Sequence, residues 1–235
     1  MRRIVFAAVA ILATSIVSFS RADSLSTGTY STGDGTDGNQ ATPAGPVGPW
    51  TLTATDSTFS YLLRSVDQSF RFDQLTNLNA VFNTNPNGTP ADTGAGGGSP
   101  RLRVQLDDTV DGRGVGSISI YLGDPPNYTG TPTDLNAYSG VNVIGSPDNG
   151  RYDTSGFTGG SPFTTYANAV AMLGNATVLR LGIVEDTFGT IGDKNITVDS
   201  LNASFVPLPS AVWGGAGLLC VLGLMKLKGR KTISA

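Results

Sequence analysis

The residues that enzymes most often use for proton transfer, metal binding and nucleophilic attack are scarce in this chain. It has no histidine, which excludes Ser-His-Asp triads, Cys-His pairs and histidine-ligated metals. Its single cysteine, Cys220, lies in an apolar run near the C-terminus, so the rest of the chain has neither a thiol nucleophile nor a disulfide. Carboxylates, hydroxyls and aromatic rings remain. We therefore expect no enzymatic activity.

One pair of neighbouring carboxylates could still support catalysis. Glu185, the only glutamate, stands beside Asp186 at the end of an expected strand. A glycosidase needs two carboxylates flanking one bond, and Glu185 with an aspartate would supply them. A solvated pair at a strand end is the simpler interpretation. A carboxylate-dependent glycoside hydrolase is thus kept as a third functional hypothesis.

Clusters of aspartate suggest calcium, the one cofactor to consider. Asp107, Asp108 and Asp111 form the better cluster, and Asp186 with Asp193 forms a second. Neither follows the spacing of an EF-hand, which requires a glutamate at the twelfth position of its loop. Asp and Gly also favour hairpin turns without any metal. Turns are therefore the default interpretation, with calcium as the alternative.

Aromatic residues provide the candidate contacts for a carbohydrate. Exposed rings stack on sugars while nearby polar groups bind the hydroxyls. The rings expected at strand ends or in loops are those of Trp50, Tyr121, Tyr128, Tyr138 and Tyr152. The same residues would equally serve as packing residues that cover the ends of a β-sandwich.

The elements that must position these residues are mostly strands. Residues 101–106 alternate strictly, so Leu102, Val104 and Leu106 share one face. Further strands are expected at 52–63, 69–82, 115–122, 141–144, 178–184 and 196–205, the last with a bulge near Leu201. Residues 164–174 predict the one helix, with a threonine N-cap and Gly174 after its end. This pattern predicts an all-β fold, an antiparallel β-sandwich that is jelly-roll-like and carries one short helix.

Composition divides the chain into a body and two targeting segments. Residues 23–49 are rich in Ser, Thr, Gly and Asp and are expected to be flexible, whereas residues 50–205 are expected to form the β-sandwich domain. All 18 acidic residues lie between Asp23 and Pro209, and seven of the 15 basic residues lie outside, which leaves eight against 18 and a net charge of −10. Such a charge excludes nucleic acid as a partner.

The N-terminus has the features of a signal peptide. Arg2 and Arg3 precede an apolar run from Ile4 to Phe19, and small residues at Ser20 and Ala22 predict cleavage after Ala22. Residues 1–22 are thus a signal helix, handled by the secretion translocon and removed by signal peptidase. An uncleaved membrane anchor is the alternative.

The C-terminus holds a short apolar run with a basic end. Residues 210–225 carry no charge, close to the ~17-residue lower limit for a transmembrane helix. The basic residues that follow favour a cytoplasmic C-terminus; they are Lys226, Lys228, Arg230 and Lys231. Before the run, Pro207 and Pro209 keep Val206-Pro207-Leu208-Pro209 extended. A permanent tail anchor or a buried helix is the alternative.

Residues 206–231 as a whole resemble the PEP-CTERM sorting signal. The resemblance rests on the motif Val206 to Pro209, the short span with Trp213 near its start, and the Lys/Arg end. It implies recognition and cleavage by an exosortase, a membrane cysteine protease or transpeptidase. The usual third residue of the motif is Glu, and Leu208 matches the less common Val-Pro-Leu-Pro variant.

The body is similar in layout to ectodomains that accompany such tails and that resemble galactose-binding-like jelly rolls. The similar fragments are Gly97-Gly98-Ser99-Pro100-Arg101, residues 181–186 and residues 198–201. Taken together, the sequence predicts an exported bacterial protein held briefly at the inner membrane and then delivered to the cell surface or extracellular matrix. A structural or interaction role is expected, and a module that binds exopolysaccharide is the alternative.

Overall fold

A computed structural model describes residues 21–24, 30–35, 42–44, 48–54, 59–66, 68–84, 100–129, 134–145, 150–186 and 194–206. Residues 21–205 form one compact unit. Residues 1–20, the apolar run 210–225 and most of the sorting motif lie outside the described residues, whereas Arg21 and Ala22, the last two residues of the predicted signal helix, lie in a strand.

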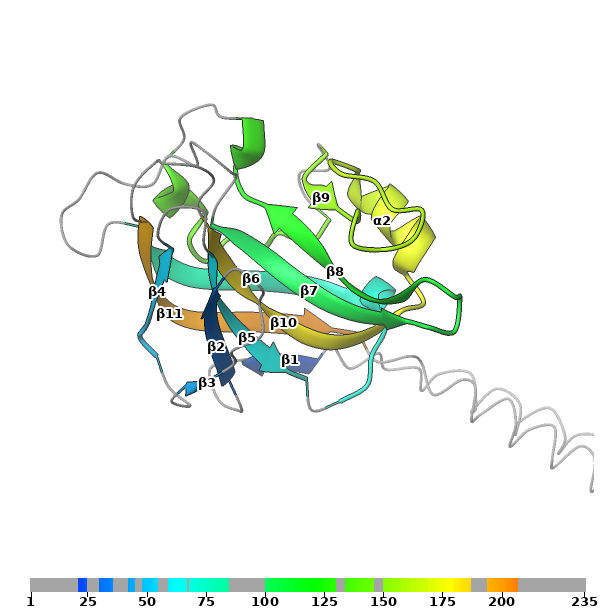
Figure 1. Cartoon of the computed structure of the whole chain (residues 1–235), viewed down its shortest axis with the longest axis horizontal. Helices are drawn as coiled ribbons and strands as arrows, with labels where there is room; N and C mark the ends of the chain where they lie inside the picture. Colours follow the sequence, from blue (N-terminus) through cyan, green and yellow to red (C-terminus); the bar gives the residue numbers. More distant parts are fainter. Residues whose placement is uncertain are drawn as a thin grey trace, which may run out of the picture. The chain divides into compact units, whose positions relative to one another are not determined.

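The body consists of two antiparallel sheets (Figure 1). The small sheet is built around β11 (Lys194–Phe205), which pairs with β6 (Leu75–Asn83) along one edge. Along its other edge β11 pairs first with β4 (Trp50–Ala54) and then, towards its C-terminal end, with β1 (Arg21–Ser24). The longest strand of the fold thus organises the small sheet.

The large sheet has the strand order β3-β2-β5-β10-β7-β8-β9. Its strands are β2 (Tyr30–Gly35), β3 (Thr42–Ala44), β5 (Phe59–Ser65), β7 (Arg101–Asp108), β8 (Gly114–Tyr121), β9 (Tyr152–Asp153) and β10 (Thr177–Asp186). Every registered pair in it is antiparallel. The mostly antiparallel β architecture predicted from the sequence is therefore confirmed.

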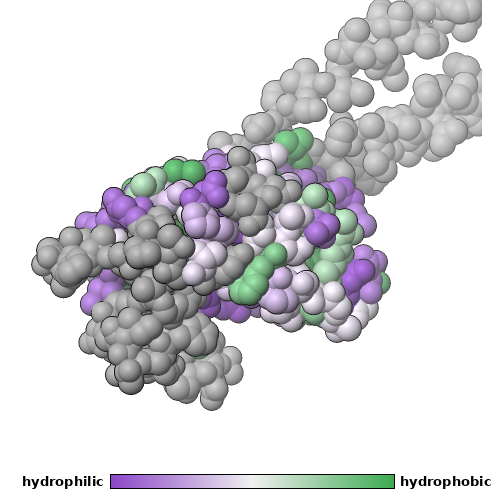
Figure 2. Space-filling view, turned by 90° about the horizontal axis from the view of Figure 1, so that it is seen from above, coloured by the Kyte–Doolittle hydropathy of each residue, from purple (hydrophilic) through white to green (hydrophobic). Residues whose placement is uncertain are grey.

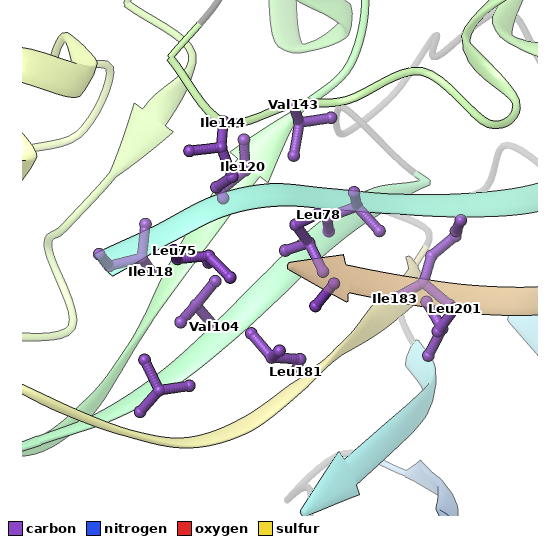
Figure 3. Packing of buried hydrophobic residues seen from close by; sticks show 14 of the residues in the cluster. Leu75, Leu78, Val104, Ile118, Ile120, Val143, Ile144, Leu181, Ile183 and Leu201 are labelled. Carbon is purple, nitrogen blue, oxygen red and sulfur yellow. The ribbon is translucent and has the colours of Figure 1, made fainter. Parts of the chain in front are cut away.

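The main core lies between the two sheets (Figure 3). Leu78 and Leu201 from the small sheet and Val104, Ile118 and Leu181 from the large sheet belong to one buried cluster. On β7 every second residue is buried, as the alternating sequence predicts. A smaller cluster of Tyr61, Leu63 and Val184 lies on the opposite face of the large sheet.

The helix α2 (Tyr166–Leu173) forms close to its predicted place. The side chain of Thr165 accepts a hydrogen bond from the backbone N–H of Asn168, which satisfies one of the free donors of the first turn. Ala169 and Leu173 are buried, and the ring of Tyr166 contacts that of Phe72 edge-on at 6.1 Å. Short 3-10 helices are found at η1 (Phe72–Gln74), η2 (Asn127–Thr129) and η3 (Leu135–Tyr138).

Four sequence-based expectations need correction. Residues 23–49 contain strands β2 and β3 and part of β1, because their backbone groups pair with β5 and β11 despite a polar sequence. The expected strand 52–63 is two strands in different sheets, β4 and β5. The expected strand 69–82 begins only at Leu75, after η1. The bulge predicted near Leu201 is present at Asp199, between Val198 and Ser200.

The fourth correction concerns residues 141–144, which run beside β6 without forming a strand. The side chain of Asn142 takes the place of a backbone acceptor there. Its Oδ1 accepts hydrogen bonds from the backbone N–H groups of Leu78 and Ile144, both at 3.0 Å. A side chain that bonds to the backbone in this way competes with a regular ladder.

Candidate functional site

Two of the predicted carbohydrate contacts are core residues. Tyr152 is fully buried, and Trp50 is 7% exposed. The hydroxyl of Tyr152 donates a hydrogen bond to the carbonyl of Val143 at 2.7 Å and accepts one from the N–H of Gly145 at 3.1 Å. Neither ring offers an open face for stacking, so the packing interpretation holds for both residues.

The other three tyrosines differ in their surroundings. Tyr138 is half-buried, and its hydroxyl accepts a hydrogen bond from the N–H of Asp124 at 3.1 Å. The side chain of Tyr128 lies outside the described residues. Tyr121 is 8% exposed at the end of β8 and lies opposite Arg101 in the large sheet. Tyr121 is therefore about as buried as Trp50 and offers no open ring face itself, but it lies beside charged residues of the sheet.

Phe163 is the exposed ring that the sequence analysis missed. It is 48% exposed, and its ring lies 5.9 Å from that of Tyr121. Its φ of 56° is the only left-handed one among the described non-glycine residues. A bulky residue there is held at a cost of roughly 1–3 kcal/mol, and such residues cluster at ligand contacts. A lone phenylalanine after the turn-forming Gly159-Gly160-Ser161-Pro162 was the available signal.

A row of polar residues lies beside these rings, on the face of the large sheet that points away from the core. Arg101, Arg103 and Gln105 alternate on β7 with buried leucines and a valine. The register places them opposite Tyr121, Ser119 and Ser117 of β8, respectively. Ser119 in turn lies opposite Asp153 of β9. We call the seven residues Arg101, Arg103, Gln105, Ser117, Ser119, Tyr121 and Asp153 the outward face.

The cations of this face have different environments. Arg101 forms an ion pair with Asp186, and its guanidinium lies over the ring of Tyr121, 5.8 Å from the ring centre. The side chain of Arg103 has no ion pair or hydrogen bond within the described part of the chain. Its partial burial, followed by the repulsion of Arg101, lowers the pKa of the Arg103 guanidinium. Among the described residues, one arginine of this face thus has an ion pair and the other has none.

Glu185 and Asp186 are buried, and the prediction of a solvated strand-end pair is wrong. Both belong to β10; Glu185 has no exposed surface and Asp186 is 5% exposed. Alternation turns them to opposite faces of the sheet, with Glu185 on the side of Ile183 and Asp186 towards Arg101. Carboxylates on opposite faces of one sheet cannot flank one bond.

The aspartates considered for calcium interact with the protein instead. Asp108 is 2% exposed and forms an ion pair with Arg113 at 2.9 Å, and Asp111 approaches the same guanidinium at 3.6 Å. Asp107 lies on the other face of β7 and accepts a hydrogen bond from the N–H of Thr109 at 3.0 Å. Among the described residues no group of three or more His, Cys, Asp or Glu is placed to hold a metal ion.

Of the predicted sorting motif, the structure describes only Val206, which is half-buried directly after β11. Pro207, Leu208, Pro209 and the basic residues 226–231 lie outside the described residues. Within the described ranges no helix is both long enough and apolar enough to cross a membrane.

Comparison with known proteins adds no relative. No known protein family, no curated protein and no solved structure matches the chain. On the side shown in Figure 2 the described surface is mainly hydrophilic or intermediate in hydropathy, with hydrophobic residues in isolated spots. Function is therefore inferred from this chain's own residues and contacts.

Proposed function

We propose that the chain is an exported bacterial surface protein whose C-terminal signal is recognised and processed by an exosortase. The support is the combination of a signal peptide, an acidic β body and a Val-Pro-Leu-Pro motif followed by an apolar run and basic residues. The translocon and signal peptidase would act on the N-terminus, and the inner membrane would hold the protein until processing.

The observation that carries this proposal is the pairing of the two ends of the body. In the β1–β11 ladder, Asp23, the first residue of the predicted mature chain, lies opposite Ala203, and Arg21 lies opposite Phe205. The predicted signal-peptide cleavage site and the residue before the sorting motif therefore lie on neighbouring strands of the small sheet.

The packing of Phe205 indicates where cleavage can occur. Its side chain is 5% exposed, and its ring stacks on that of Phe70 with centres 4.3 Å apart. Cleavage before Val206 would require this end of β11 to open. We therefore place the cut after Val206, close to Pro209, where β11 stays intact. Cleavage after Ala22 would shorten β1 to Asp23 and Ser24.

Intact mass and fractionation of the native protein test the proposal. We expect a mature form that begins at Asp23 and ends near Pro209, outside the inner membrane. A double Pro207→Ala, Pro209→Ala variant should accumulate in the inner membrane, whereas the exposed body proline in Pro162→Ala should not affect processing. A native protein that keeps its basic tail in the inner membrane would contradict the proposal and indicate a simple anchor.

A second candidate function, carbohydrate binding, is favoured by the Phe163–Tyr121 pair. An exposed ring beside a polar row is the arrangement that sugar-binding sites use. It would suit the jelly-roll-like arrangement expected from the sequence, with exopolysaccharide as the ligand. A hydrolase gains no support, because the only glutamate is buried.

Glycan-array binding of the full chain tests this second function. Phe163→Ala should remove binding, whereas Val110→Ala, at a 97% exposed position in the turn between β7 and β8, should not. If both variants bind glycans like the parent chain, Phe163 is no sugar contact.

A further inference from the structure

We propose that the outward face, centred on Arg103, binds the carboxylate of an acidic sugar unit in a polysaccharide. This inference rests on the carbohydrate-binding function above. It adds that the ligand is negatively charged and that Arg103 binds the charged group. It is carried by Arg103, a half-buried arginine whose side chain forms no ion pair among the described residues.

Arg103 lies in the middle of the outward face. It lies on β7 between Ser119 of β8 and Gly182 of β10. Gly182 has no side chain of its own, and the space above it is occupied by Leu63 of β5, whose Cδ2 would lie 2.5 Å from a Cβ at position 182. Arg103 itself is half-buried.

Among the described residues no acidic side chain forms an ion pair with Arg103. Asp186 pairs with Arg101, and Asp153, which lies opposite Ser119, accepts hydrogen bonds from Ser155. Arg180 occupies the outward, exposed position opposite Gln105 and also has no ion pair within the described ranges. Partial burial of a cation is costly unless an anion lies near it. A bound carboxylate would offset that cost.

The neighbouring groups fit a sugar acid better than other anions. A guanidinium binds a carboxylate through two parallel hydrogen bonds. Ser117 and Ser119 provide hydroxyls for a sugar, and Phe163, which contacts Tyr121, provides an exposed ring at the end of the face. The body's excess of acidic residues repels a densely charged polyanion such as nucleic acid. One carboxylate per sugar ring gives a lower charge density.

Calorimetric titration of the full chain in a non-ionic detergent tests the proposal. The probes are an oligogalacturonate, its neutral methyl ester and inorganic phosphate. We expect the acidic oligosaccharide to bind more tightly than the ester. Arg103→Gln should lower its affinity about 10- to 100-fold, the cost of one charge-assisted hydrogen-bond pair. Arg103→Lys keeps the charge but loses the bidentate geometry, and should recover only part of the affinity.

Arg71→Gln is the matched control. It removes one positive charge from a half-exposed arginine that pairs with Asp73, away from this face, and should leave binding unchanged. Equal affinity for the acid and the ester, unchanged in Arg103→Gln, would overturn acid recognition while carbohydrate binding stands. Binding of neither oligosaccharide would count against both. If phosphate competes fully at the same Arg103-dependent site, the site binds anions in general and the proposal of a sugar acid is overturned.

Discussion

The two faces of strand β7 carry opposite chemistry within eight residues. Leu102, Val104 and Leu106 point into the core and are at most 1% exposed. Arg101, Arg103 and Gln105 point the other way and are half-buried. Core packing accounts for the first set, because apolar surface leaves water on folding. It does not account for partly buried arginines, and this is why the outward face is the better place to look for a ligand.

The largest expected effect comes from removing core contacts on the inward side. Leu106→Ala should lower the free energy of unfolding by about 2–5 kcal/mol, because it deletes buried methyl groups and leaves a cavity. Urea unfolding of the full chain, followed by far-ultraviolet circular dichroism, measures the change.

The control on the same strand is Gln105→Ala, which changes a half-buried outward residue. The free energy of unfolding of this variant should stay within about 0.5 kcal/mol of that of the parent chain, as is usual for surface substitutions. Similar losses in both variants would contradict the division between an inward packing face and an outward binding face.

The sequence predicted the inward face well because alternation is a local signal. Leu102, Val104 and Leu106, and likewise Ile118 and Ile120 of β8, are buried as their spacing predicts. The helix was also predicted correctly, from its threonine N-cap and the spacing of its apolar residues. These features depend on residues close together in the chain.

Features set by partners distant in the chain were missed or wrong. Strand β2 forms because β5 supplies its hydrogen bonds, and no alternation in its own sequence indicates this. Glu185 and Asp186 belong to the sheet because β10 continues two residues past its pairing with β7, opposite Ser60 and Phe59 of β5. Phe163 meets Tyr121 only after β9 pairs with β8. The candidate binding face therefore could not be assembled from sequence spacing alone.

The second largest loss of stability is expected at Asp108, the last inward-facing residue of β7, just before the turn that leads to β8. Asp108 is buried and pairs with Arg113, so Asp108→Asn should cost about 1–3 kcal/mol by weakening a charge-assisted hydrogen bond. The urea midpoint at pH 7 measures it.

Asp107→Asn is the outward control for this change and should have the smaller effect. Hydrogen bonds from Thr109 lower the pKa of Asp107. Its contribution is therefore present above the ordinary carboxyl pKa and lost as the pH falls through the lowered value. A larger loss of stability for Asp107→Asn than for Asp108→Asn would contradict the expectation that the inward residue contributes more to stability than the outward one.

A third, smaller effect is expected at β9, the edge strand of the large sheet. Tyr152→Phe keeps the buried ring but removes the hydroxyl that bonds to Val143 and Gly145. We expect a loss of about 1–2 kcal/mol, because a buried carbonyl loses its donor. Hydrogen exchange should show faster exchange at the amide of Gly145. Unchanged exchange and stability would mean that the ring alone holds this segment.

The smallest expected effect on stability is also the one that tests the outward face most directly. Because folding lowers the pKa of Arg103, the protonated guanidinium is less favourable in the folded than in the unfolded chain. This unfavourable contribution is present at all pH values below that pKa, which includes the neutral range. Arg103→Gln removes the charge, so its urea midpoint at pH 7 should equal or exceed that of the parent chain. The same variant should lose affinity for an acidic sugar. A clear loss of stability would show instead that Arg103 is a structural residue of the large sheet.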